Sequence, residues 1–101
     1  MYILMVELRG RPERLEELAS ALCALAAAAR TEPGIACYAV QRRADRPDTF
    51  LLCEWYRDEA AWETHMALAP VREALGRFDA LLAEPPGITR CDPVALACRP
   101  A

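Results

Sequence analysis

One nine-residue segment of this chain, 49–57, is apolar on both of the faces that a β-strand would present. Successive side chains of a strand point to opposite sides of the sheet. The two expected faces are Phe50, Leu52, Glu54 and Tyr56 on one side and Leu51, Cys53 and Trp55 on the other. The chain's own helices can cover only one side of a sheet, and a bare apolar face is unusual on a soluble monomer. We therefore expect a second copy of the sheet to cover the other side, and the protein to be a homodimer.

The length and net charge of the chain limit the kinds of protein that it can be. The chain has 101 residues, of which 54% are hydrophobic, which predicts one globular domain over residues 1–101 and leaves no room for a second. The formal net charge of -3 argues against nucleic acid as a partner, because binding to phosphates needs a basic face. No run approaches the roughly 20 apolar residues of a membrane span, and the first residues lack the basic region of a secretory signal. We expect no membrane association and a cytoplasmic location.

The first half of the chain predicts a strand, a helix and two further strands. Apolar side chains recur at alternating spacings of three and four after Pro12, which is the pattern of an amphipathic helix running to about Arg30. Short apolar runs bounded by glycine, proline or aspartate are typical of strands. The predicted strands are Tyr2–Leu8, Ile35–Gln41 and Thr49–Arg57, the last two joined as an antiparallel hairpin by the polar segment 42–48.

The second half predicts a broken helix and a final extended region. Asp58 is a natural N-cap for a helix from Glu59 to about Met66, and Pro70 can open a second one. The chain then reads as two extended pieces, Ile88–Cys91 and Val94–Cys98. The whole order is β-α-β-β-α-β, which predicts an α+β class with a ferredoxin-like protomer, an antiparallel sheet and helices on one side of it.

Cysteine, lysine and asparagine usage limits the chemistry. The five cysteines include no C-x-x-C pair, and three lie in apolar runs, which favours reduced, buried thiols over disulfides or a metal site. All twelve basic residues are arginine, so no lysine exists to form a Schiff base. The chain contains no asparagine. Phosphate loops, nucleotide fingerprints, metal-ligand clusters and nucleophile motifs are also missing from the sequence.

His65 is the only histidine, and therefore the only side chain whose ordinary pKa lies near neutrality. On a helix it would share a face with Trp62, and together they would meet the sheet face that carries Glu54. Such an imidazole in an apolar pocket would be a general base. A half-exposed histidine near a helix end is the alternative. Glu54 either pairs with an arginine or serves the site with a raised pKa.

Aromatic side chains surround these positions and are candidates for the wall of a flat cavity. Aromatics at strand and helix spacing also occur as plain core residues, so both interpretations stay open here. The candidates are Tyr38, Trp55, Tyr56 and Trp62.

Three segments resemble the antibiotic biosynthesis monooxygenase family. They are Glu32-Pro33-Gly34 after the first helix, residues 50–60 of the second hairpin strand and beyond, and Trp62 to His65. Members of this family are dimeric α+β barrels. They include quinol and anthrone monooxygenases that use neither metal nor flavin, haem-degrading monooxygenases, and an isomerase of a signalling molecule.

The resemblance implies a homodimeric enzyme that oxidises a small aromatic quinol or anthrone with O₂ and needs no cofactor. His65 would be the catalytic base or proton shuttle, and Glu54 would orient it or act as an alternative base. The substrate would contact Trp62, Trp55, Tyr38, Tyr56 and Phe50. Which strand face bears the pocket stays open, so Trp55 and Glu54 need not both line it.

Two alternatives belong to other classes. One is a non-catalytic dimeric domain that binds a small molecule or serves an accessory role, which a pocket filled by side chains would favour. The other is a haem-degrading monooxygenase. Haem-degrading members rely on an Asn, a Trp and a His, and the absence of asparagine from this chain disfavours that activity.

Overall fold

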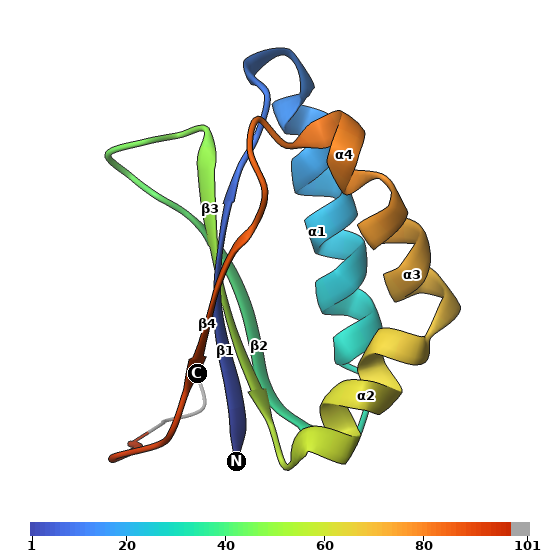
Figure 1. Cartoon of the computed structure of the whole chain (residues 1–101), viewed down its shortest axis with the longest axis vertical. Helices are drawn as coiled ribbons and strands as arrows, with labels where there is room; N and C mark the ends of the chain where they lie inside the picture. The colour runs from blue at the N-terminus through green and yellow to red at the C-terminus, as the bar shows by residue number, and fades with distance from the viewer. Residues whose placement is uncertain (98–101) are drawn as a thin grey trace.

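The computed structural model describes residues 1–97 as a four-stranded antiparallel sheet with the helices on one side of it (Figure 1). The strands are β1 (Tyr2–Arg9), β2 (Ile35–Arg42), β3 (Thr49–Tyr56) and β4 (Gly87–Cys91). They lie in the order β2-β3-β1-β4, so the two most apolar strands occupy the centre. This is the strand order of a split βαβ fold, and the expected α+β, ferredoxin-like class is confirmed.

The helices begin and end close to the residues that the sequence predicts. They are a short 3₁₀ turn η1 (Pro12–Arg14), α1 (Leu15–Ala29), α2 (Glu59–Ala67), α3 (Ala69–Gly76) and α4 (Phe78–Leu81). The expected N-cap is present, since the backbone N–H of Ala61 donates to the Asp58 carboxylate at 2.8 Å. Pro70 lies in the first turn of α3, where a missing N–H costs nothing.

The core lies between α1 and the sheet. Leu18, Leu22 and Leu25 of α1 are buried, at spacings of four and three, in one cluster with Leu8 and Leu52 from the central strands. The predicted apolar stripe of this helix is therefore confirmed. Burial of these side chains is the main force that holds α1 across the sheet, at roughly 1.5–3 kcal/mol for each fully buried leucine.

The two faces of β3 separate as the alternation predicts. Phe50, Leu52, Glu54 and Tyr56 are all buried on the side of the helices. Leu51, Cys53 and Trp55 lie on the opposite side, which we call the outer face, and are half-buried in the single chain. Met5 of β1 pairs with Cys53 on the same face and is 41% exposed. The outer face is thus apolar and open.

Two expectations need correction. The predicted extended piece Val94–Cys98 forms no strand over residues 94–97, and Cys98 lies outside the described residues. The cysteines are less buried than expected: Cys23 and Cys37 are exposed, and Cys53 and Cys91 are half-buried. Apolar runs did not predict burial here because α1 turns one side to solvent and the cysteines of the strands lie on the open outer face. No helix within residues 1–97 combines the length and apolar character that crossing a bilayer requires.

Candidate functional site

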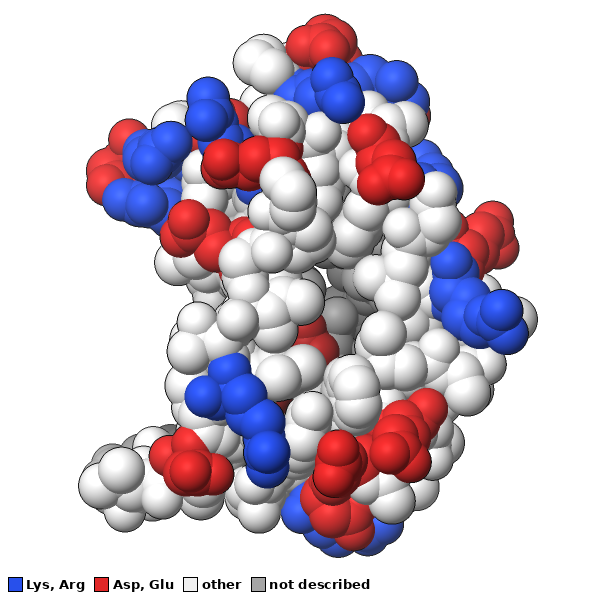
Figure 2. Space-filling model, in the orientation of Figure 1, with Lys and Arg blue, Asp and Glu red and all other residues white. Residues whose placement is uncertain are grey.

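A cavity of about 330 Å³ lies between the helices and the sheet. Figure 2 shows it as a hollow whose walls are mostly uncharged. Leu25 of α1, Val71 and Leu75 of α3 and Ile88 of β4 line it, and all four strands contribute side chains. Its size and its mainly apolar wall with a few polar groups are typical of sites for small molecules.

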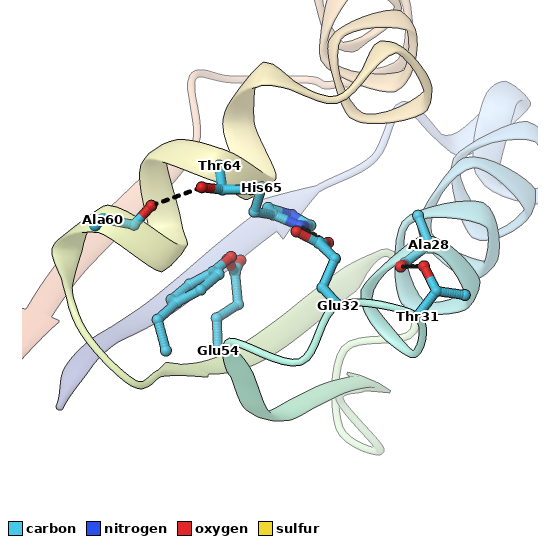
Figure 3. Close-up of polar contacts among 8 residues, drawn as sticks. Ala28, Thr31, Glu32, Glu54, Ala60, Thr64 and His65 are labelled. Atoms are coloured by element: carbon cyan, nitrogen blue, oxygen red, sulfur yellow. Dashed lines mark hydrogen bonds and ion pairs between the residues drawn. The ribbon is translucent and has the colours of Figure 1, made fainter.

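His65 is the buried polar group at the helical side of this cavity. It lies on α2, is only 2% exposed, and its Nδ1 is 2.7 Å from Oε2 of Glu32. Glu32 lies in the turn between α1 and β2, so a residue 33 positions earlier fixes the imidazole (Figure 3). Among residues 1–97, Nε2 of His65 makes no hydrogen bond. This nitrogen is available to a molecule bound in the cavity.

Glu54 is the second buried polar group, on the sheet side of the cavity. It is 7% exposed, and its Oε1 accepts a hydrogen bond from the Tyr56 hydroxyl at 2.6 Å. Burial raises the pKa of Glu54, and both the Tyr56 hydrogen bond and the nearby His65 oppose that rise. Within the described residues no arginine pairs with it, so the expected ion pair is absent and its pKa stays raised.

The partner of His65 differs from the expected one. Glu54 was the expected orienter, but the carboxylate that contacts the imidazole belongs to Glu32. Glu54 bonds to Tyr56 instead. Figure 3 shows the two carboxylates approaching the underside of α2 from different elements, Glu32 from the turn before β2 and Glu54 from β3.

Two tyrosine rings flank the imidazole. Their centroids lie 5.5 Å (Tyr38) and 5.6 Å (Tyr56) from the His65 ring. Burial is the main cause that raises the pKa of both phenols, and the negative charge of Glu54 adds to it. Both hydroxyls therefore remain protonated at neutral pH, and the Tyr56 hydroxyl donates its proton to Glu54.

The mouth of the cavity carries a stack of aromatic rings. Trp62 of α2 lies against Tyr2 of β1 with their centroids 5.2 Å apart and their planes 25° from parallel. Both rings line the cavity. Arg90 lies on β4, and its guanidinium carbon is 4.3 Å from the centroid of the Tyr2 ring. These rings contribute apolar surface to the cavity wall.

Four of the seven predicted site residues line the cavity, and a fifth, Tyr56, contacts two of them from behind the wall. Tyr38, Glu54, Trp62 and His65 line the cavity. Trp55 lies on the outer face, and its prediction as cavity wall is wrong because strand alternation turns it away from Glu54. Tyr56 is fully buried behind Glu54, and Phe50 is buried in the core, so neither forms part of the wall.

Sequence reasoning missed Glu32 as a site residue, although it belongs to the Glu32-Pro33-Gly34 segment that carries the family resemblance. Gly34 explains part of this segment. A Cβ at Gly34 would lie 2.7 Å from the Cβ of Ala61, so only glycine lets the turn approach α2 this closely. The close approach places Glu32 within reach of His65. Among residues 1–97, no three potential metal ligands lie together.

Comparisons with known proteins agree with this architecture. The sequence profile of the antibiotic biosynthesis monooxygenase family matches residues 1–77. A curated protein of Bacillus subtilis strain 168, named "Putative monooxygenase YcnE", is 28% identical over 92 residues, which cover 91% of this chain and 97% of that protein.

Solved structures of similar proteins share the fold of this chain. The structure of PA3566 from Pseudomonas aeruginosa is 28% identical with a TM-score of 0.84, over 93% of this chain and 94% of that one. Rv0793 from Mycobacterium tuberculosis shares the fold with a TM-score of 0.89 at 24% identity, over 96% and 98% of the two chains. Because the family profile covers more than half of the sequence, the chain belongs to the antibiotic biosynthesis monooxygenase family.

Proposed function

We infer that the protein oxidises a small aromatic substrate of the anthrone or quinol type with O₂, and that the substrate itself takes the place of a cofactor. The observation that carries this proposal is the position of His65. It lines an apolar cavity, its Nδ1 is held by Glu32, and its Nε2 has no partner among residues 1–97. A base with one nitrogen fixed and the other free has the geometry that proton abstraction needs.

The chemistry balances without an added reductant. For an anthrone, Nε2 of His65 removes a proton from the methylene carbon, and the resulting anion passes one electron to O₂. Recombination forms a C–O bond, and the peroxide loses water to leave a carbonyl. One oxygen atom ends in the product and the other in water, so that CH₂ and O₂ become C=O and H₂O.

The surroundings of His65 support this chemistry in two ways. The Glu32 carboxylate stabilises the imidazolium that forms when the base accepts its proton, as a buried acid does in other base-orienter pairs. The mainly apolar wall offers water few hydrogen-bond partners beside the reactive anion. Glu54, whose pKa is raised by burial, is the second acid-base group of the proposal.

The open cavity favours a domain that holds a small molecule, as the proposed enzyme would, over an accessory domain that binds none. A domain without a substrate needs no free space beside a buried histidine, because side chains normally fill protein interiors to near crystal density. Here about 330 Å³ is free between the sheet and the helices, and His65 borders it. This volume lies within the range of ligand pockets.

We also infer that the working form is a homodimer in which two outer faces meet. Leu51, Cys53 and Trp55 are only half-buried in the single chain, and Met5 is 41% exposed. Val94, after β4, is 99% exposed, and the described chain beyond β4 turns to the side of the sheet away from the helices (Figure 1). An isologous contact of about 1,500 Å² or more, the size of a stable dimer interface, would cover these side chains.

Oxygen consumption tests the proposed reaction. Purified protein is mixed with a panel of anthrones and hydroquinones, and the rate is compared between the wild type, His65→Ala and Thr64→Ala. Thr64 is the matched control, because it is the exposed neighbour on α2 and its hydroxyl bonds only to the Ala60 carbonyl. We expect the His65 variant to lose at least about 100-fold in rate. Equal rates in all three proteins would remove His65 from the mechanism.

A further inference from the structure

Arg90 is the only arginine within residues 1–97 that lines the cavity. It lies on β4 directly opposite Leu4 of β1. Leu4 is buried on the side of the helices, and directly opposed residues of an antiparallel pair share a face. The Arg90 side chain therefore emerges on the cavity side of the sheet, at an exposed position at the mouth.

The guanidinium of Arg90 is held by a ring rather than by an acid. Its Cζ lies 4.3 Å from the centroid of Tyr2, and Tyr2 is in turn stacked on Trp62. No carboxylate within residues 1–97 lies close enough to form an ion pair with it. Stacking restrains the side chain but uses none of its five N–H donors. The guanidinium of Arg90 is therefore restrained, has no neutralising acid among the described residues, and can donate its N–H groups to a ligand in the cavity.

Charged groups of opposite sign line the cavity from different strands, Arg90 from β4 and Glu54 from β3. Arg90 stacks on Tyr2, the Tyr2 ring lies 6.4 Å from Tyr56, and the Tyr56 ring lies 5.6 Å from His65. Two aromatic rings, Tyr2 in the wall and Tyr56 behind it, therefore separate the cation from the imidazole. Glu32 contacts His65, and Glu54 lies in the same row of the sheet as Arg90 with Leu4 between them. A negative group on a ligand is favoured at Arg90 and disfavoured near the two acids.

We propose that the substrate is a planar aromatic carboxylate, with its carboxylate held by Arg90 at the mouth and its uncharged rings directed toward His65. The proposal names the substrate class of the same cavity and so rests on the proposed function for its catalytic meaning. The planar fork of a guanidinium matches the two oxygens of a carboxylate. The Tyr2 and Trp62 rings, which both line the cavity, supply apolar surface beside it. This arrangement fixes which end of the molecule reaches the base.

Binding, without turnover, tests this orientation. The dissociation constants of 2-naphthoate and of the uncharged 2-naphthamide are measured by calorimetry for the wild type, Arg90→Gln and Arg42→Gln. Arg42 is the matched control, because it is an exposed strand arginine stacked on a ring, 4.8 Å from the Phe50 centroid, and it does not line the cavity. We expect the wild type and Arg42→Gln to prefer naphthoate by about tenfold, and Arg90→Gln to lose that preference.

The outcomes separate this proposal from the proposed reaction. Equal binding of the two probes by the wild type, a preference that persists in Arg90→Gln, or no binding of either probe would each overturn it. Arg90→Lys keeps the positive charge without the planar fork and should retain part of the preference. Thermal unfolding of each variant shows that the fold is intact. If the protein consumes oxygen with uncharged anthrones but shows no preference for naphthoate, the proposed reaction is supported and the carboxylate proposal is wrong. If naphthoate binding depends on Arg90 but no substrate leads to oxygen consumption, the carboxylate proposal is supported and the proposed reaction is wrong.

Discussion

Nδ1 of His65 and Oε2 of Glu32 lie 2.7 Å apart, although the two residues belong to a helix and to a turn separated by 33 positions. Both side chains are almost completely shielded from solvent, with 2% and 11% of their surfaces exposed. A contact this short between buried groups defines the imidazole's orientation and the nitrogen that carries its proton. An ionised Glu32 carboxylate can only accept, so in the neutral ring Nδ1 donates to it and Nε2 is left as the acceptor.

The first prediction concerns that tautomer. Replacing Glu32 with alanine removes the acceptor and should reduce the Nδ1–H form, and we expect kcat to fall by roughly 10- to 100-fold. Glu32→Gln retains an acceptor oxygen and should lose less. Because His65 is the only histidine, ¹⁵N NMR of its imidazole reads the tautomer without assignment. Glu63→Ala, an exposed acid on α2, is the control. An unchanged tautomer in Glu32→Ala would show that the contact does not orient the ring.

The second prediction concerns the pH dependence of stability. Burial raises the pKa of Glu54 in the folded protein above its unfolded value of about 4.3. The folded state then holds this proton more tightly, so the contribution is stabilising below the unfolded pKa and is lost as pH rises through the raised folded pKa. Glu54→Gln carries no such proton and accepts the same Tyr56 hydrogen bond.

Urea unfolding at a series of pH values checks this sign. The free energy of unfolding of Glu54→Gln, relative to the wild type, should increase from about pH 4 upward until the folded pKa is passed. Glu63→Gln should show no such trend, because that acid is exposed. A relative stability of Glu54→Gln that stays flat with pH, or falls, would mean that the folded pKa is not raised.

The third prediction concerns the close approach at Gly34. A Cβ there would lie 2.7 Å from the Ala61 Cβ, so Gly34→Ala must push the turn away from α2. We expect a loss of about 1–3 kcal/mol in the free energy of unfolding, which is typical of overpacking. Gly76→Ala is the control, since nothing lies within 4 Å of the added carbon. Equal unfolding free energies for the two variants would rule out this account of the glycine.

The fourth prediction concerns assembly. Sedimentation equilibrium at micromolar concentration should give about twice the chain mass of 11.2 kDa. Met5→Arg places a charge on the outer face and should shift the protein to monomer, because an unpaired charge is costly to bury. Glu16→Arg, on an exposed position of α1, should leave the dimer intact. A wild-type monomer would mean that the outer face is covered in some other way.

The sequence predicted most of the fold because its strongest signals are periodic. The leucines of α1 recur at helical spacing, and the alternation along β3 assigned Leu52 and Trp55 to opposite faces. Alternation alone does not say which face a helix will cover, so both Trp55 and Glu54 stayed candidates although they lie on opposite faces. That choice depends on which side α1 packs against, which is a tertiary contact.

The site was harder to predict than the fold for the same reason. His65 was recognisable as the single histidine on a helix, but its partner Glu32 is distant in sequence and meets it only through the turn that Gly34 permits. Arg90 has no motif around it. Its significance comes from the strand register that places it opposite Leu4 and over the Tyr2 ring.

We infer that the protein inserts one atom of O₂ into an aromatic substrate bound in this cavity, and that His65 is the base. Incubation of the purified protein with anthrone under ¹⁸O₂, followed by mass spectrometry of the anthraquinone formed, tests it most directly. We predict one ¹⁸O atom in the product of the wild-type reaction, formed at a rate that His65→Gln lowers at least about 100-fold while its unfolding curve shows an intact fold. Product without the label, or labelled product formed equally fast by His65→Gln, would contradict the claim.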